Sequence, residues 1–355
     1  MWNPDRREVL QLGLGGALAL ASGCGIRRAG SIVAPDELHD RGSPPDHHLI
    51  ERLADPFCGE GRLERIVRSW ITPEPDFFVL NHGRVPVFDE PARYAVEIFG
   101  HITTTRPLTL ARLRSMPRTT VEATLVCAGN RRREHHAVQP IEDPVLWTGG
   151  AIGNARWTGV RLVDVLEEIG VKNDAAHVWL EGHDTGVDGR FGGSIPITRI
   201  YDRDAPPVLL AFEMNDRPLT PRHGFPVRAI VPGFIGARSV KWLARILVAT
   251  RPSHNPFFLR NHHWRDGEGG IDQGPIYELR TNAVICTPAS GLALRGPVTV
   301  SGYAIAGDPR ATITRVEVST DGGRRWRPAA LGKNVSPSCW RGGYLYDGWS
   351  MIDLT

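Results

Sequence analysis

A cysteine followed almost at once by three arginines is the strongest chemical feature of this 355-residue chain. Cys127 stands where the apolar run Thr124–Val126 meets a Gly-Asn turn, and Arg131, Arg132 and Arg133 follow. Nearby cations lower the pKa of a thiol, and a thiolate is both a soft ligand for a redox metal and a nucleophile. The pattern therefore allows a metal ligand, a nucleophile, or a buried structural cysteine beside a solvated arginine run.

Basic and polar side chains gather in short blocks downstream of this cysteine. Guanidinium and ammonium groups pair with the oxygens of a phosphate, and the glycines and prolines between them permit close backbone approach. Asp184 has the acceptor oxygens that the N–H groups of a heterocycle need. The candidate ligands for an anionic phosphate are His223, Arg228, Arg238, Ser239 and Lys241.

The segment Cys127–Arg132, Cys-Ala-Gly-Asn-Arg-Arg, resembles the metal-ligand motif of the sulfite oxidase and plant-type nitrate reductase family. Further blocks similar to that family follow in the same order and together cover roughly residues 75–265. These blocks are Asn81–Gly83, Trp147–Gly159, Glu181–Asp184 with Ser194–Pro196, Glu213–Asn215, His223–Arg228 and Val231–Trp242.

The resemblance implies a molybdenum-molybdopterin cofactor and oxygen-atom transfer at an oxo-molybdenum centre. Two dithiolene sulfurs of the pterin and the thiolate of Cys127 would hold the metal. Asn81, His82 and Asp184 would bind the pterin, together with the phosphate ligands named above. The cofactor supplies the difficult chemistry in such enzymes, and the protein positions the substrate.

The same resemblance points to Arg132 and Trp147 as catalytic residues that would place an oxyanion before the metal, with Arg131 beside them. We expect a small-molecule substrate, sulfite or a related compound. The chain has no haem motif, so its electrons would pass to a separate cytochrome. A reductase acting on nitrate or a sulfoxide at the same site is the alternative.

Two residues depart from the pattern of the sulfite-oxidising members. Leu80 stands where they have an arginine, and Phe212 stands where they have a tyrosine near the exchangeable oxygen of the metal. Loss of a charge-assisted hydrogen bond of roughly 1.5–3 kcal/mol weakens anion binding by one or two orders of magnitude. The sequence therefore leaves room for a neutral or larger substrate.

Two further interpretations stay open on the sequence. The chain could be a cofactor-free, inactive binding protein of this fold. It could also be a cysteine-nucleophile enzyme in which Cys127 works with His135 or His136.

Residues 1–30 have the features of a twin-arginine export signal, with Arg6 and Arg7 ahead of the apolar run Val9–Gly23. That run is about half of the ~20 residues that span a bilayer. We therefore expect an exported, periplasmic protein, and a lipid anchor at Cys24 is the minority alternative.

The remaining chain divides by composition into a linker and two domains. Residues 31–47 read as a solvated linker, and residues 48–268 as a mixed α+β molybdopterin-binding domain. Alternating strands and the turn Asp321–Gly323 predict an immunoglobulin-like β-sandwich over residues 269–355, which would serve dimerisation. This segment is shorter than the ~100 residues of a full sandwich, so we expect it to be incomplete and the homodimer to be uncertain.

Local patterns add a helix and several strands. A helical stripe predicts a helix over Val160–Gly170, and apolar runs predict strands at Thr124–Val126, His177–Leu180 and Val240–Ala249.

Composition excludes some classes of partner and cofactor. The formal net charge of +3 is small for this length and gives no footprint for nucleic acid. The five cysteines are scattered, with neither zinc-site spacing nor a motif for covalent haem.

Overall fold

The computed structural model describes residues 48–186, 188–265, 272–288, 298–308, 310–311, 313–329 and 350–354. The predicted export signal, the linker and Cys24 lie outside these residues, as does much of the predicted incomplete tail. Within the described ranges, no helix is long and apolar enough to cross a membrane.

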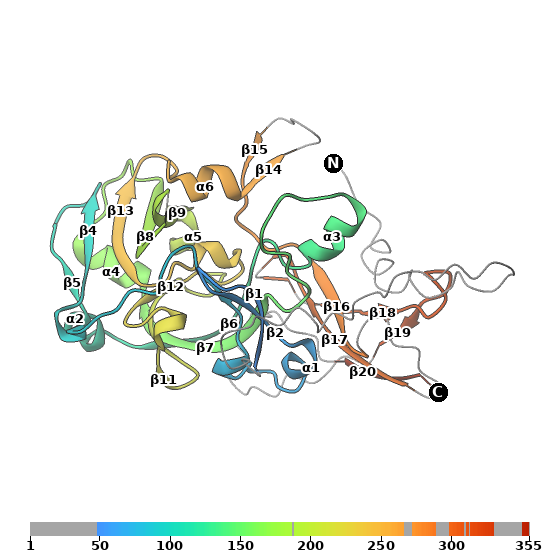
Figure 1. The fold of residues 1–355 in the computed structure, drawn as a ribbon. Helices are drawn as coiled ribbons and strands as arrows, with labels where there is room; N and C mark the ends of the chain where they lie inside the picture. Colours follow the sequence, from blue (N-terminus) through green and yellow to red (C-terminus); the bar gives the residue numbers. More distant parts are fainter. Residues whose placement is uncertain are drawn as a thin grey trace, which may run out of the picture.

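Two five-stranded sheets form the body of the catalytic part (Figure 1). In the first sheet the strand order is β11-β10-β7-β6, and β12 pairs with β10. Its strands are β6 (Thr119–Val126), β7 (Ile152–Arg161), β10 (Leu209–Met214), β11 (Arg217–Pro218) and β12 (Arg228–Ile230). All pairings in this sheet are antiparallel.

The second sheet has the order β5-β4-β13-β8-β9, in which β13 runs parallel to β4 and the other neighbours are antiparallel. Its strands are β4 (Ala95–Gly100), β5 (Leu108–Thr109), β8 (His177–Gly186), β9 (Gly189–Pro196) and β13 (Leu243–Ala249). A smaller antiparallel sheet joins β1 (Leu49–Leu53), β2 (Cys58–Gly61) and β3 (Val79–Leu80).

The helices are short and connect or cover these sheets. They are α1 (Leu63–Ile66), α2 (Leu110–Ser115), α3 (Arg132–Val138), α4 (Leu162–Ile169), α5 (Ile197–Tyr201) and α6 (Pro256–Asn261). The helix predicted over Val160–Gly170 is confirmed as α4, and Gly170 ends it at a positive φ of 72°. It begins later than predicted because Val160 belongs to β7, where it pairs with Leu210.

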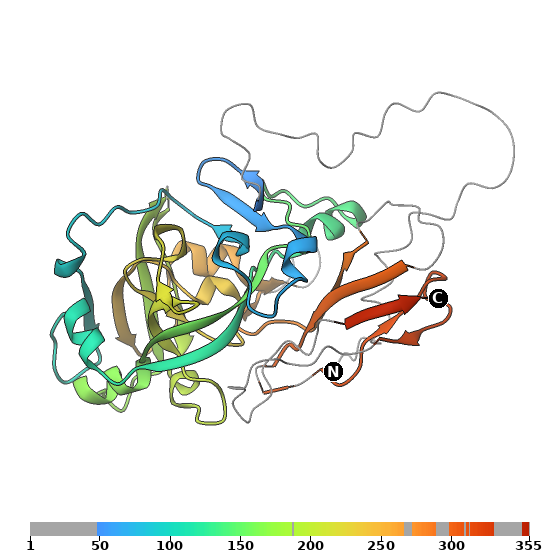
Figure 2. The same cartoon turned by 90° about the horizontal axis from the view of Figure 1, so that it is seen from below.

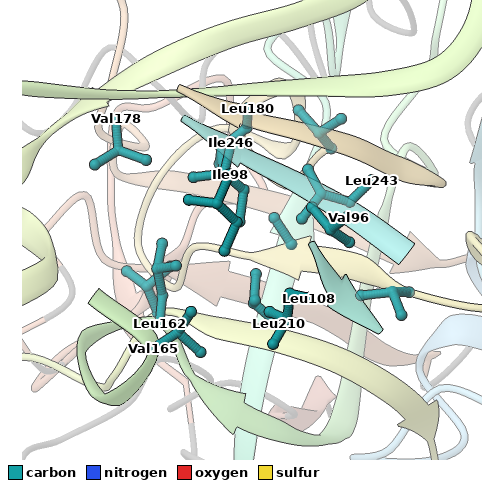
Figure 3. Packing of buried hydrophobic residues seen from close by; sticks show 14 of the residues in the cluster. Val96, Ile98, Leu108, Leu162, Val165, Val178, Leu180, Leu210, Leu243 and Ile246 are labelled. Atoms are coloured by element: carbon teal, nitrogen blue, oxygen red, sulfur yellow. The ribbon is translucent and has the colours of Figure 1, made fainter. Parts of the chain in front are cut away.

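The main hydrophobic core lies between the two sheets (Figure 3). Ile98 of β4, Leu180 of β8 and Ile246 of β13 face Leu210 of β10 across this core. The apolar stripe of α4, which includes Leu162, packs into the same cluster, as an amphipathic helix requires.

The C-terminal strands form a separate β region beside this body, as Figures 1 and 2 both show. Its strands are β16 (Asn282–Thr287), β17 (Val298–Ile305), β18 (Glu317–Val318), β19 (Arg327–Pro328) and β20 (Ser350–Leu354). The short pair β14 (His263–Arg265) and β15 (Asp272–Pro275) lies beside α6 instead (Figure 1). The order β16-β17-β20 forms one sheet, and β18 pairs with β19 around the predicted turn at Asp321–Gly323. The prediction of an α+β domain followed by a β region is confirmed.

A buried carboxylate ties the small N-terminal sheet to the segment before β7. Glu60 of β2 is fully buried and accepts hydrogen bonds from Arg52 Nε (2.6 Å), Thr148 N (2.9 Å), Thr148 Oγ1 (2.8 Å) and Gly150 N (3.2 Å). Each of these donors would lose its acceptor if the carboxylate were removed. The Glu60–Arg52 pair therefore holds the segment at Thr148 and Gly150 in place next to the turn that carries Cys127.

We predict that Glu60→Gln lowers the free energy of unfolding by about 3 kcal/mol, because it breaks an ion pair whose carboxylate is fully buried and leaves the half-buried Arg52 guanidinium without its counter-charge. The control is Glu97→Gln, which breaks an exposed pair with Arg245 at 3.0 Å and should change the free energy by less than about 0.5 kcal/mol. Urea denaturation followed by fluorescence measures both. Equal losses in the two variants would contradict the assignment.

Candidate active site

A cleft at the junction of the two sheets brings most of the predicted site residues together. The space between its walls is about 640 Å³, a volume that includes open solvent. The predicted residues that line it are His82, Cys127, Asp184, His223, Arg228, Ser239 and Lys241. Segments far apart in the sequence thus converge on one concave site.

Cys127 follows the last residue of β6 and lies at the wall of the cleft. Its N–H donates to Ala151 O at 3.0 Å, and the N–H of Gly129 donates to its Sγ at 3.4 Å. Burial raises the pKa of the thiol, and the Gly129 N–H and the charge of Arg132 only partly oppose this. The effect of burial on the pKa of Cys127 therefore outweighs the lowering expected from the three arginines. A bound metal cation would add positive charge and favour the thiolate.

Arg131 and Arg132, which follow the Cys127 turn, have different partners. Arg131 Nε donates to Glu134 Oε2 at 2.8 Å, and its Nη1 donates to Asn282 Oδ1 at 2.9 Å in the C-terminal region. Arg132 pairs with Asp143 at 2.8 Å and lies against the Cα of Gly129. Neither guanidinium lines the cleft. Arg132 supports the back of the turn.

Trp147, the second residue predicted to be catalytic, is also placed behind the cleft. Its side chain is 1% exposed and packs in the cluster that contains Phe77, Leu125 and Cys127. It does not line the cleft, so in this arrangement it packs against the cysteine strand without facing a substrate.

Arg228 is a buried cation with an incomplete set of partners. Its Nη1 donates to His223 O and its Nη2 to Ser239 O, both at 3.0 Å, and its guanidinium lies 4.9 Å from the Trp157 ring centroid. Its Nε is buried and has no partner in the described part of the chain. Burial lowers the pKa of Arg228 to about 9, which leaves it charged at neutral pH.

Lys241 is the second basic side chain of the cleft lining, and it is half-buried. Its Nζ donates to Asn81 Oδ1 and, at 3.0 Å, to Arg222 O. Asn81 does not line the cleft itself, so its contribution to the site is to hold the ammonium of Lys241 in position. Burial, followed by the charge of Arg228, lowers the pKa of Lys241 to about 7, and Asp184 partly offsets both effects.

Asp184 and the two histidines complete the predicted polar lining. Asp184 Oδ1 is buried with no partner among the described residues, and burial raises the pKa of this carboxyl to about 6. Burial lowers the pKa of His82 and of His223 to about 3, so both rings are neutral. The ring of His82 stacks on Phe191 with centroids 4.0 Å apart.

Ser239 Oγ accepts from Val231 N at 3.0 Å and shapes the adjacent loop.

Arg238 has a different place from the one predicted. Its guanidinium donates to Ile276 O at 2.7 and 3.1 Å and lies over the rings of Phe258 and Tyr277. It does not line the cleft. It instead ties the loop that contains Gly236 to the C-terminal region.

Several lining residues were not predicted from the sequence as site residues, among them Phe191, Arg222 and His262. The ring nitrogen Nδ1 of His262 lies 3.1 Å from Phe257 O, and burial lowers the pKa of this histidine to about 4. Arg222 is exposed at the cleft and its guanidinium lies 4.7 Å from the Phe57 ring centroid. Arg222 directly precedes the predicted His223 and could have been added from sequence, whereas the other two face the cleft only through tertiary packing.

The two departures from the family pattern have different outcomes. Leu80 lines the cleft, as expected. The expectation for Phe212 is wrong: its ring is 3% exposed within the core between the sheets, with the Arg118 guanidinium 5.4 Å from its centroid. A hydroxyl at that position would not face the cleft.

His135 and His136 lie on α3 and do not line the cleft either, which gives Cys127 no base from this helix.

The unpartnered atoms show what kind of ligand the cleft fits. Asp184 Oδ1 is a buried acceptor, and Arg228 Nε is a buried donor on a cation. Buried polar groups without partners are costly, so a ligand with N–H groups and an anionic group would satisfy both. A pterin that carries a phosphate has these features.

Comparison with known proteins agrees with this chemistry. Residues 82–257 match the family model of the oxidoreductase molybdopterin binding domain, and residues 273–345 match the Mo-co oxidoreductase dimerisation domain. Sulfite oxidase from Arabidopsis thaliana is 36% identical over 306 residues, which cover 81% of this chain and 77% of that protein. The chain belongs to the sulfite oxidase family. The molybdopterin-binding domain predicted from the sequence is thereby confirmed.

Other members of the family extend the comparison. Mitochondrial sulfite oxidase from Drosophila melanogaster is 36% identical over 94% of this chain, which spans 60% of that relative; the match to the Homo sapiens enzyme spans 52% of its length. Nitrate reductase [NADH] 2 from Arabidopsis thaliana is 34% identical, covering 92% of this chain and 39% of that protein. The solved structure of the sulfane dehydrogenase SoxCD from Paracoccus pantotrophus matches with a TM-score of 0.71 and 25% identity, covering 92% of this chain and 82% of that chain.

The pKa values of Lys241 and Asp184 predict a pH dependence of anion binding. Raising the pH from 6 to 8.5 removes the proton of Lys241 (pKa about 7) and that of Asp184 (about 6), so both changes make the cleft less positive. The cleft histidines, with pKa values of about 3 to 4, stay neutral over this range. We expect sulfate to bind the cofactor-free protein about tenfold more weakly at pH 8.5.

Isothermal titration calorimetry measures this affinity. Lys241→Met is the matched variant, because it removes the titrating ammonium and keeps the aliphatic length. It should bind sulfate weakly at pH 6 and lose most of the pH dependence. Equal affinity of the unaltered protein at the two pH values would contradict the prediction.

Proposed function

We propose that this member of the sulfite oxidase family is a molybdenum-molybdopterin oxidoreductase that transfers an oxygen atom to a small sulfur-containing substrate. The observation that carries the proposal is the opening of the Cys127 thiol, the buried guanidinium of Arg228 and the half-buried ammonium of Lys241 onto one cleft. A thiolate is a soft ligand for a redox metal, and buried cations need an anionic partner.

In this proposal, different residues of the cleft bind different parts of the cofactor. Arg228 and Lys241 would bind the phosphate, with the neutral ring of His223 beside them, and Asp184 Oδ1 would accept from the N–H groups of the pterin. Cys127 would be the protein ligand to molybdenum. When bound, the cofactor supplies two-electron oxygen-atom transfer chemistry.

The protein's own groups would orient the substrate and limit the access of water. The wall of the cleft beside Cys127 is largely apolar, and Leu80, Leu125 and Phe191 contribute to it. Such a wall favours a substrate of low charge over a multiply charged anion. Sulfite oxidases and a sulfane dehydrogenase, which are named for sulfur compounds, support a sulfur-containing substrate.

Reduction of nitrate or of a sulfoxide at the same site is the second candidate. The similarity to nitrate reductase [NADH] 2 favours it. Steady-state assays separate the two: sulfite or a sulfane-type compound with an oxidised electron acceptor, and nitrate or a sulfoxide with a reduced electron donor. Turnover in the second set alone would replace the proposed direction of catalysis.

The proposal extends to partners and location. The dimerisation domain matched at residues 273–345 supports a homodimer. A separate cytochrome would accept electrons one at a time. The arginine pair and apolar run at the N-terminus support export to the periplasm, with lipid attachment at Cys24 as the alternative.

Replacement of the proposed metal ligand tests the site directly. Cys127→Ser should reduce kcat by about three orders of magnitude or more, because a serine hydroxyl is a harder and poorer ligand than a thiolate. Ser115→Ala, at the exposed last residue of α2 and outside the cleft lining, is the control and should keep kcat within about twofold. Full activity in Cys127→Ser would exclude the proposed ligand.

The apolar lining predicts a gain of anion affinity in Leu80→Arg. A new guanidinium in the cleft would make a charge-assisted contact of roughly 1.5–3 kcal/mol and lower the KM for sulfite by about 10- to 100-fold. Leu80→Gln has a polar but uncharged side chain and should lower it far less. An unchanged KM in Leu80→Arg would show that this wall does not contact the substrate.

A further inference from the structure

We propose that the C-terminal β region is a working part of the active site, in which Tyr303 of β17 is a positioning residue for the turn that carries Cys127. It acts through Asn130 and does not touch the cleft. The inference rests on the proposed role of Cys127, because the position of the turn matters only if the cysteine works there.

The hydroxyl of Tyr303 connects two segments of the catalytic domain. Tyr303 is 2% exposed; its OH accepts from Asn130 Nδ2 and donates to Gly149 O, both at 2.8 Å. Asn130 belongs to the turn after Cys127, and Gly149 belongs to the segment before β7. A single hydroxyl from the C-terminal region therefore joins the turn after Cys127 to the segment before β7.

Asn130 transmits this contact to the cysteine. Its backbone N–H donates to Cys127 O at 2.9 Å, and its Oδ1 accepts from Ala151 N at 3.1 Å. Ala151 O in turn accepts from the N–H of Cys127 at 3.0 Å. The backbone on both sides of Cys127 is thus fixed by a closed set of hydrogen bonds, and Tyr303 anchors that set to the second domain.

Apolar packing supports the same coupling. Val126, the residue before Cys127, shares one hydrophobic cluster with Tyr303 and Ile305 of β17 and Cys286 of β16. The approach is close, since a side chain at Gly149 would meet Val284 at 2.7 Å. In Figures 1 and 2, α3, which directly follows the turn, lies beside β16.

Backbone hydrogen bonds hold the opposite wall of the cleft as well. Leu279 N donates to Gly233 O at 3.0 Å, and Ile235 N donates to Tyr277 O at 2.8 Å. These contacts precede the loop whose Gly236 and neighbours line the cleft. Because a reacting group must be held within about 0.5 Å of its working position, a domain that contacts both walls can set the geometry of catalysis.

Tyr303→Phe tests the hydroxyl while keeping the ring, and Tyr277→Phe is the matched control. Tyr277 also lies in the C-terminal region, and its hydroxyl bonds to Ser194 of β9, away from the Cys127 turn. The first readout is the rate at which iodoacetamide alkylates Cys127 in the cofactor-free full-length chain, measured by peptide mass spectrometry. We expect Tyr303→Phe to raise this rate about fivefold and Tyr277→Phe to leave it unchanged.

The second readout uses the molybdenum-loaded protein. Tyr303→Phe should lower kcat about tenfold at nearly constant KM and shift the thiolate-to-metal absorption band, while molybdenum content stays the same. Asn130→Ala breaks the same hydrogen bond by removing the partner of the Tyr303 hydroxyl in the turn. It should reproduce both effects, and it decides the question if Tyr303→Phe fails to fold.

Alkylation at the unaltered rate in Tyr303→Phe, or an equal rise in Tyr277→Phe, would overturn the inference. The alkylation readout needs neither molybdenum nor turnover. A protein that binds no molybdenum would therefore refute the proposed function, whereas an unchanged alkylation rate would refute the positioning role of Tyr303.

Discussion

Burial of positive charge around one cleft is the constraint on which the rest of the structure depends. Arg228 is 5% exposed, and the ammonium of Lys241 lies beside it in the same lining. The carbonyls of His223 and Ser239 satisfy part of the Arg228 guanidinium, but its Nε has no partner among the described residues. Buried charge is costly unless it is paired, so the fold holds a site that an anionic ligand completes.

The two sheets and the C-terminal region share the task of holding this site. One sheet carries Cys127 at the end of β6, and the other carries Asp184 in β8. The buried carboxylate of Glu60 fixes the segment that faces the cysteine turn, and Arg238 joins the opposite loop to the C-terminal region. The cleft is therefore a product of three structural units, and the chain matches both a molybdopterin binding domain and a dimerisation domain.

The sequence predicted the composition of the cleft better than the direction of individual side chains. Cys127, Asp184 and Arg228 were predicted from motifs, and the structure brings them together. Arg132 and Trp147 lie in matching motifs, yet salt bridging to Asp143 and core packing turn them away from the cleft. Residue type and spacing fix which chemistry is available, but orientation depends on partners distant in sequence.

The central claim is that this cleft holds a molybdenum cofactor. The most direct test is metal analysis by mass spectrometry of the full-length protein, produced in a host that makes the cofactor. We expect one molybdenum atom per chain, released together with the pterin on denaturation. Folded protein that carries no molybdenum would contradict it.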